Sequence, residues 1–178
     1  MPALRAALSG GHAVLVAEPG SGKTTLVPLL LLDEDWLAGR RIVMLEPRRP
    51  AARMAAARMA RLCNETIGQT VGYQVRFERR LSAATRIEVV TEGLLVRRMQ
   101  GDPELSDVGL VIFDEFHERN LQGDLSLALC LDVVRSLRQD LRLLVMSATL
   151  DPEPICRWLP AEAIRAPGRT HPIEVSYD

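Results

Sequence analysis

The sequence predicts an α/β domain in which a mostly parallel β-sheet is covered by helices on both faces. Short, continuously apolar runs recur along the chain, and segments with helical character separate them. Strands that are buried on both faces in this way are typical of parallel sheets, whose crossover helices lie on either side. The 178 residues are enough for one such domain and too few for two.

Six runs along the chain are predicted strands. Most are continuously apolar, the run at 108–113 most of all, whereas the run at 71–77 alternates apolar and polar residues. The predicted strands are residues 13–16, 41–45, 71–77, 86–90, 108–113 and 141–146.

Helices are predicted between and beside these strands. The segment 51–62 holds six alanines and two methionines, which favours a helix that packs closely on a sheet. The segment 121–137 is apolar on nearly all sides, and we therefore expect a buried helix there. The other predicted helices are residues 3–8, 26–32, 94–100 and 153–159.

Composition and charge predict an ordinary globular protein. The net charge is −1, with 47% hydrophobic and 25% charged residues. No apolar run approaches the roughly 20 residues of a membrane span, and the N-terminus lacks the apolar core of a signal peptide. Cys63, Cys130 and Cys156 are spaced like neither a metal nor a redox motif. We therefore expect a cytoplasmic protein with reduced thiols and no membrane partner.

A glycine-rich turn, Ala-Glu-Pro-Gly-Ser-Gly-Lys-Thr-Thr at residues 17–25, follows the first predicted strand and leads into a predicted helix. This order of strand, turn, Gly-Lys-Thr and helix is the phosphate-binding loop of P-loop nucleotidases. Backbone N–H groups of the turn and the helix N-terminus can hold a polyanion. The residues expected around the phosphates are Pro19, Gly20, Ser21, Gly22, Lys23, Thr24 and Thr25.

Two side chains of this loop have specific expected roles. Lys23, the only lysine in the chain, would reach the β- and γ-phosphates, and the Thr24 hydroxyl would bind Mg²⁺. An ordinary strand–turn–helix corner is the structural alternative. Such a corner needs a glycine, but it does not need the whole Gly-Ser-Gly-Lys-Thr-Thr sequence.

Polar groups also follow the other predicted strands. Because the carboxyl ends of parallel strands share one edge of a sheet, ligands bind at that edge. We therefore expect these groups to lie near the phosphate-binding loop. They are Arg48 and Arg49, Thr91, Asp114 and Glu115, and the tripeptide Ser147-Ala148-Thr149.

The acid pair that follows the most apolar strand suits nucleotide hydrolysis. Asp114 would bind Mg²⁺ opposite Thr24, and Glu115 could also face the metal and accept a proton from the attacking water. A helix N-cap followed by a first-turn acid is the structural alternative. His117 lacks a second histidine four residues later, so a hydrogen-bond relay fits it better than a zinc site.

Taken together, these segments resemble motifs I, Ia, Ib, II and III of superfamily 2 DEAH-box helicases. The matching segments are residues 17–25, 46–49, 91–93, 114–119 and 147–149. Ala17 stands where the loop usually has its first glycine, a change more typical of helicases than of kinases. Phe116 replaces the usual alanine of motif II, which, with the segment 71–78, is similar to the bacterial HrpB-type branch.

The resemblance implies that residues 1–178 form the first RecA-like domain, a P-loop NTPase domain, of an ATP-dependent RNA helicase. It implies ATP, or another NTP, with Mg²⁺ as ligands, and single-stranded RNA, or DNA, as partner. Arg58 would stack on the base, His117 would act in catalysis, and Ser147 and Thr149 would couple the nucleotide to the nucleic acid. The residues that would contact the nucleic-acid backbone are Arg48, Arg49, Thr91, Glu92 and Gly93.

Motifs IV, V and VI of the family have no counterpart in this sequence. We expect them on a second RecA-like domain, absent from this chain, that would supply the arginines completing the hydrolysis site. We therefore expect the chain alone to bind nucleotide, with little or no hydrolysis and no unwinding.

Two other functions are alternatives. A P-loop protein of another class, such as a small kinase or a transporter ATPase, would carry an acceptor lid or a signature after the loop, and neither is recognisable. A binding module without catalysis would have lost Lys23, Asp114 or Glu115, and all three are present. On charge alone, the arginine-rich segments are better explained as solvated helix faces than as a nucleic-acid surface.

Overall fold

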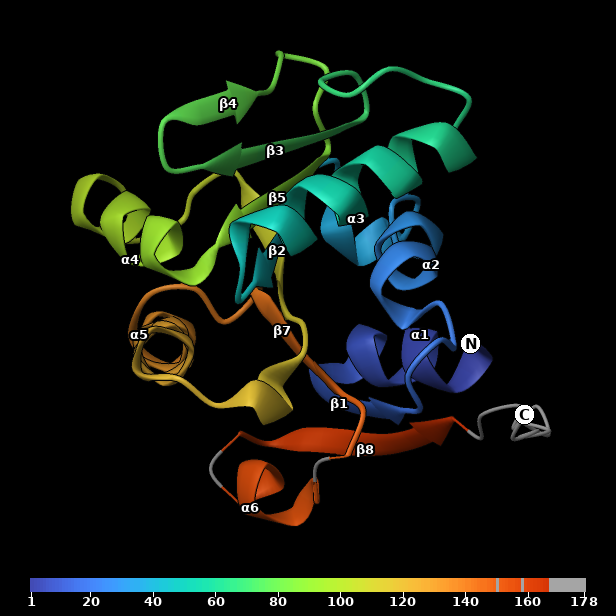
Figure 1. The fold of residues 1–178 in the computed structure, drawn as a ribbon. Coiled ribbons are helices and arrows are strands. Elements are labelled where there is room, and N and C mark those ends of the chain that lie inside the picture. The colour runs from blue at the N-terminus through green and yellow to red at the C-terminus, as the bar shows by residue number, and fades with distance from the viewer. Residues whose placement is uncertain (150, 158, 167–178) are drawn as a thin grey trace, which may run out of the picture.

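An eight-stranded sheet forms the centre of the computed structural model, which describes residues 1–149, 151–157 and 159–166 (Figure 1). The strand order is β4-β3-β5-β2-β6-β7-β1-β8, and all neighbours are parallel except β3 and β4. The strands are β1 (His12–Ala17), β2 (Arg41–Glu46), β3 (Val71–Val75), β4 (Glu78–Arg80), β5 (Ile87–Thr91), β6 (Val108–Phe113), β7 (Arg142–Ser147) and β8 (Ala161–Ala166).

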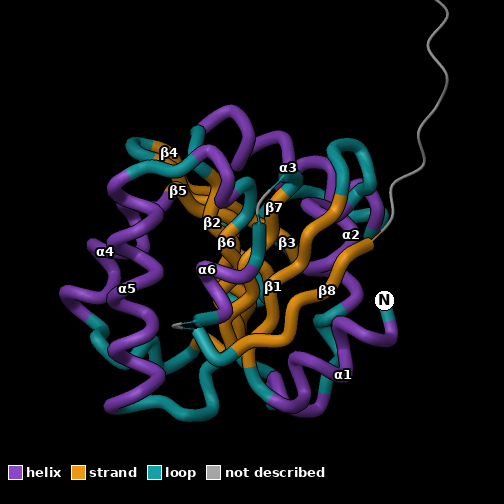
Figure 2. The backbone as a smooth tube through the Cα atoms, turned by 90° about the horizontal axis from the view of Figure 1, so that it is seen from below, coloured by secondary structure: helices purple, strands orange, loops and turns teal. Residues whose placement is uncertain are grey.

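Helices cover both faces of this sheet, as the sequence predicts. Figure 2 shows α4 and α5 on one side of the strands and α1 and α2 on the other. In the described residues the helices are α1 (Pro2–Gly10), α2 (Lys23–Leu30), α3 (Arg49–Leu62), α4 (Glu92–Gly101), α5 (Leu121–Ser136) and α6 (Glu153–Cys156), with short 3-10 helices η1 (Asp35–Leu37) and η2 (Phe116–Glu118). No helix in this part of the chain is long and apolar enough to cross a membrane.

Alternate residues of the central strands enter two separate hydrophobic clusters. On β2, Ile42 and Met44 pack in the cluster that includes α1, α2 and α3, whereas Val43 and Leu45 pack in the cluster that includes α4, α5 and α6. Successive side chains of a strand point to opposite faces, and here both faces are covered. The apolar runs are therefore continuous rather than alternating, and the predicted α/β fold is confirmed.

Two strands were missed in the sequence. The run at 71–77 does not continue to Phe77, because the strand ends at Val75 and Phe77 has a φ of 69°. The chain then returns as β4, antiparallel to β3, through a turn without glycine or proline. At the opposite edge, β8 pairs with β1 but is half exposed and lacks an apolar run.

The prediction of a buried helix at 121–137 was wrong in its degree of burial. Leu121 is 79% exposed, and Leu125 and Leu137 are 40% and 54% exposed. The helix α5 belongs to an outer layer, and only the side that packs on α4 and the sheet is buried, at Gly123, Ser126, Leu127, Cys130, Leu131 and Val133.

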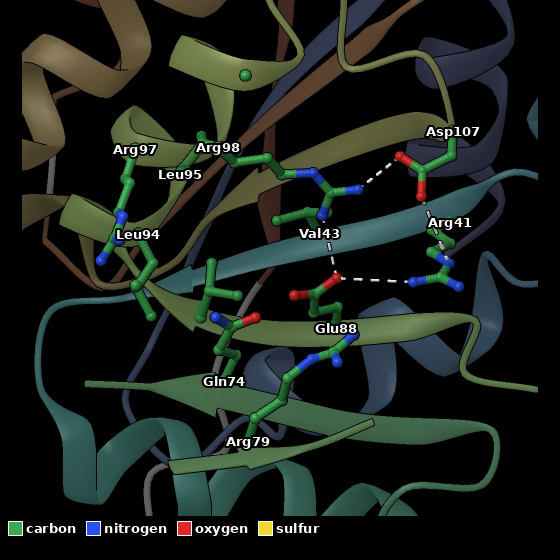
Figure 3. Close-up of a pocket in the computed structure, with 12 residues that line it drawn as sticks. Arg41, Val43, Gln74, Arg79, Glu88, Leu94, Leu95, Arg97, Arg98 and Asp107 are labelled. Carbon is green, nitrogen blue, oxygen red and sulfur yellow. Dashed lines mark hydrogen bonds and ion pairs between the residues drawn. The ribbon is translucent and has the colours of Figure 1, made fainter. Parts of the chain in front are cut away.

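A groove of about 690 Å³ lies between α4 and strands β2 to β5 (Figure 3). On its floor, the buried Glu88 lies 3.0 Å from an Arg98 nitrogen and 3.9 Å from an Arg41 nitrogen. The same two arginines lie 2.5 and 3.6 Å from Asp107 oxygens. Because each acid faces two guanidinium groups, this network neutralises Glu88 and ties α4 to the sheet.

Candidate nucleotide site

Two glycines shape the loop between β1 and α2. Gly20 and Gly22 have φ values of 77° and 80°, in the left-handed region that side chains disfavour. A Cβ atom on Gly22 would also lie 3.0 Å from the Leu26 side chain. Gly22 is the N-cap of α2, so the helix begins at Lys23 rather than at Leu26, where the sequence placed it.

The loop reaches the acid pair across the sheet edge. Lys23 Nζ lies 3.1 Å from Glu115 Oε1, and the Lys23 side chain is 5% exposed. The Thr24 hydroxyl donates a hydrogen bond of 2.5 Å to Asp114 Oδ2. The structure therefore brings together two segments that are 90 residues apart, as the strand-end argument predicts.

Asp114 is a buried carboxyl with several polar neighbours. Burial raises its pKa, whereas the Thr24 hydroxyl, the Glu115 backbone N–H and the Lys23 ammonium oppose that rise. The Glu115 N–H donates to Asp114 Oδ1 at 2.8 Å. These donors hold both oxygens of Asp114 in fixed positions.

A third carboxyl, Glu46, joins this site, and the sequence analysis assigned it no role. It ends β2 and is 2% exposed. Burial, and then the charges of Asp114 and Glu115, raise the pKa of Glu46 to about 9. This rise favours the protonated form of Glu46, whose Oε1 is buried without a hydrogen-bond partner among the described residues. An acid at the end of an apolar strand, directly before Pro47, is the signal that could have found it.

His117 lies between Glu115 and the end of β7. Its Nδ1 is 3.3 Å from Glu115 Oε2, and the Ala148 backbone N–H points at the same nitrogen from 3.5 Å. Glu115 itself has a φ of 48°, in the left-handed region. His117 thus connects the acid pair with the Ser147-Ala148-Thr149 segment.

A cavity of about 560 Å³ opens beside the loop and the acids. It is lined by Thr24, Thr25, Glu46, Arg48, Pro50, Ala51, Met54, Ala55, Arg58 and Glu115. The exposed Arg58 on α3 therefore shares a cavity with the phosphate-binding loop. Arg48 lines it as well, and its guanidinium donates to Glu118 Oε1 at 2.8 Å.

Comparison with known proteins identifies the family. The sequence model of the DEAD/DEAH box helicase family matches residues 1–157. The chain belongs to this family. It is 52% identical, over 179 aligned residues, to the ATP-dependent RNA helicase HrpB of Escherichia coli K12, and the match covers 99% of this chain and 22% of that protein.

Solved structures give the same result for the fold of this DEAD/DEAH helicase domain. A crystal structure of the E. coli DEAH/RHA helicase HrpB matches with a TM-score of 0.91 at 52% identity. A second crystal structure, that of the E. coli DExH-box NTPase HrpB, matches with a TM-score of 0.89 at 51% identity. Each match covers 97% of this chain and 22% of the other. The chain thus spans about a fifth of the length of these relatives, and its predicted resemblance to DEAH-box, HrpB-type helicases is confirmed.

The remaining predicted residues lie at different depths in the helicase domain. Ser147 ends β7 in register with Val16 of β1 and is fully buried, whereas Thr149 is exposed. Arg49, the first residue of α3, is exposed. Ser147 and Thr149 are the two residues predicted to couple the nucleotide to the nucleic acid. Only the Thr149 side chain is accessible to a ligand in this conformation.

The Thr91-Glu92-Gly93 segment begins α4 at the same sheet edge. The Glu92 carboxylate turns toward α5, where it accepts a hydrogen bond from Asn120 Nδ2 at 3.1 Å. The Ser126 hydroxyl donates to the Glu92 backbone carbonyl at 3.3 Å. Burial raises the pKa of Glu92. Gly93 is exposed and Thr91 half-buried, which leaves the backbone of this turn accessible.

Proposed function

We propose that this chain is the ATP-binding motor domain of an ATP-dependent RNA helicase. Joined to a second RecA-like domain of the same protein, it would couple NTP hydrolysis to translocation along single-stranded RNA and unwinding. One observation carries the proposal: the phosphate-binding loop and the acid pair meet, through Lys23–Glu115 at 3.1 Å and Thr24–Asp114 at 2.5 Å. Its cytoplasmic location stays a prediction.

The residues at this edge fit a magnesium–nucleotide complex. Thr24 and Asp114 offer hydroxyl and carboxylate oxygens, the donors that Mg²⁺ prefers, and Glu115 adds a further carboxylate beside them. Mg²⁺ in such sites takes most of its other ligands from phosphates and water. When bound, the ion would neutralise charge on the phosphates. Among the residues described, no group of three or more His, Cys, Asp or Glu side chains could hold a metal ion by itself. The phosphates and water would therefore complete the coordination of Mg²⁺.

The chain's own side chains have distinct roles in this proposal. Lys23 would exchange its ion pair with Glu115 for the β- and γ-phosphates, which releases Glu115 to accept a proton from water. His117 would limit the movement of Glu115, because its ring lies against that carboxylate with Nδ1 3.3 Å from Oε2. Arg58, which lines the same cavity as the phosphate-binding loop, would stack on the base of the nucleotide. A guanidinium stacks on any base, so this contact is compatible with ATP or another NTP.

The proposed RNA contacts lie at the same edge as the nucleotide site. Arg48 and Arg49 follow β2, and Thr91, Glu92 and Gly93 follow β5, the neighbouring strand. The proposal of RNA, rather than another polyanion, rests on the name of the 52% identical relative, an RNA helicase. DNA would offer the same backbone phosphates.

Nucleotide binding by Lys23→Ala tests the proposal. The wild-type chain should bind a non-hydrolysable ATP analogue with Mg²⁺, and the variant should bind it about 10–100-fold more weakly, because a charge-assisted hydrogen bond contributes about 1.5–3 kcal/mol. Isothermal titration calorimetry measures both. Arg97→Ala, at an exposed position on α4, is the matched loss of one cation. Equal affinities of the wild type and Lys23→Ala would contradict the proposed site.

A further inference from the structure

The residues that follow the acid pair touch both proposed nucleic-acid elements. Glu118 of η2 accepts a hydrogen bond of 2.8 Å from the Arg48 guanidinium, after β2. Asn120, two residues later, donates one of 3.1 Å to Glu92, at the start of α4. One short segment, 114–120, therefore links the nucleotide site to both elements.

This segment is short and conformationally constrained. Glu115, before η2, has a φ of 48°, and Arg119, after it, has a φ of 37°. Both values lie in the left-handed region, which disfavours residues with a Cβ atom. Glu118 N–H donates to the Glu115 carbonyl at 2.9 Å, so the two residues belong to one turn. This bond ties the backbone of Glu118 directly to that of Glu115.

The far end of the turn is fixed. Asn120 is the N-cap of α5, where its side-chain oxygen accepts from the Gly123 N–H at 2.9 Å while its amide nitrogen donates to Glu92. Gly123 packs so closely that an added Cβ would lie 2.7 Å from a Glu92 oxygen. Because Asn120 is held on both sides, displacement of Glu118 acts on the end of the turn that carries Glu115.

Arg48 and Arg49 differ in how available they are to a phosphate. Arg49 has no ion-pair partner among the residues the structure describes, whereas Arg48 is already paired with Glu118. In that pair the Arg48 side chain is 69% exposed and the Glu118 side chain 33% exposed. Exposed ion pairs are weak, so a phosphate can compete for the guanidinium. Any phosphate that binds Arg48 must displace the Glu118 carboxylate or be repelled by it.

We propose that Glu118 is a positioning residue that occupies Arg48 until a nucleic-acid phosphate displaces it. Its release lets the 115–118 turn, and with it Glu115, take the position that the bound nucleotide favours. Nucleotide and nucleic acid then strengthen each other's binding, since such coupling is reciprocal. This inference rests on the proposed function, and it concerns how the two ligands of that site communicate.

The test is RNA binding to the whole chain, with a labelled oligouridine followed by fluorescence anisotropy at low salt. In Glu118→Gln, we expect RNA to bind about 2–5-fold more tightly without nucleotide, because the competing carboxylate is gone. In the same variant, the ratio of RNA affinities with and without the Mg²⁺–ATP analogue should fall toward one. Glu118→Asp, which keeps the charge, should restore part of the wild-type behaviour.

Two further variants show whether Glu118 acts through Arg48. Arg48→Gln should bind RNA more weakly, and adding Glu118→Gln to it should change the affinity no further. Glu104→Gln removes an equal charge from an exposed position in the loop before β6 and is the control for general electrostatics. Thermal unfolding of each variant checks that the fold is intact.

The outcomes separate the two proposals. A wild-type chain that binds neither nucleotide nor RNA overturns the proposed function and this inference with it. If the wild type binds both, the inference alone is overturned by an unchanged or lower RNA affinity of Glu118→Gln. It is equally overturned if Glu104→Gln has the same effect, or if Glu118→Gln acts undiminished in the Arg48→Gln background.

Discussion

His12 adds a side-chain hydrogen bond to the backbone pairing of β1 with β7. Its Nδ1 accepts a hydrogen bond of 3.1 Å from the Leu143 backbone N–H, and the residue is 9% exposed. Burial, and after it the charge of Arg142, lowers the pKa of His12 from 6.5 to about 4. The accepting nitrogen must be unprotonated, so the hydrogen bond and the pKa describe the same neutral ring.

The stability of the domain should therefore fall in mild acid. The unfolded chain binds more protons at His12 than the folded chain between pH 6.5 and about 4, so the stabilisation is complete above pH 6.5 and is lost as the pH falls toward 4. We expect His12 to account for about 1–3 kcal/mol of this loss. Urea unfolding at pH 7 and at pH 4.5 measures it.

The control for this prediction is His12→Asn, whose carbonyl oxygen can accept the same hydrogen bond and does not titrate. Every other titrating group is shared by the two proteins, so the difference between their pH dependences isolates His12. Identical loss of stability in both proteins would refute the assignment.

Among the elements, the loop before α2 depends most on backbone conformation. Gly22→Ala places a side chain at a φ of 80° and within 3.0 Å of Leu26. We expect a loss of about 1–2 kcal/mol in the free energy of unfolding, together with weaker nucleotide binding. Thermal unfolding and titration with the ATP analogue measure the two effects.

Gly10→Ala is the matched substitution for this prediction. An added Cβ at Gly10, the last residue of α1, meets nothing within 4 Å, and we expect stability to be unchanged or slightly higher. If Gly22→Ala behaves like Gly10→Ala, the loop does not require its left-handed glycine.

The elements that could be predicted are those whose burial or backbone conformation requires particular residues in the element itself. The strand at 108–113 is buried on both faces, so it appears as an apolar run, and the loop at 17–25 needs its glycines for its own backbone. By contrast, β8 is defined only by its pairing with β1, and β4 by a turn that has no turn residue. The partner of β8 is distant in sequence, whereas β4 pairs with the adjacent β3 through residues that carry no turn signal, so neither strand leaves a local pattern.

The same distinction holds within the candidate site. Lys23 and Asp114 could be placed together because parallel strand ends share an edge, and the structure brings their segments into contact. The burial of Glu46 depends on strands β5 and β6 on either side of it and could not be predicted from its neighbours in sequence. Glu92 also met an unpredicted partner, since Asn120 belongs to a helix whose packing on α4 the sequence did not specify.

For the whole molecule, the net charge of −1 does not show that two exposed arginines, Arg48 and Arg49, follow β2 at the edge that carries the phosphate-binding loop. If Arg48 and Arg49 both contact RNA phosphates, replacing both with alanine should weaken RNA binding at low salt. The RNA association constant should also depend less steeply on salt. The magnitude of the slope of its logarithm against log salt should fall by about 1.4, since each phosphate contact on a single strand contributes about 0.7.

Anisotropy titrations across about 50 to 200 mM salt measure this slope. Arg135→Ala with Arg157→Ala, two exposed arginines on α5 and just after α6, removes the same charge elsewhere and should leave the slope near that of the wild type. An unaltered slope in the Arg48 and Arg49 variant would remove both residues from the RNA interface.

The position of β1 in the sheet also determines when this site can form during synthesis. β1 precedes every other described strand of this sheet in the sequence, yet its hydrogen-bonding neighbours are β7 and β8, the last two of those strands. Pairing across so much chain is slow, because loop-closure entropy is lost before the contacts form. A nascent chain that stops before β7 should therefore carry a complete Gly-Lys-Thr sequence and still fail to retain ATP.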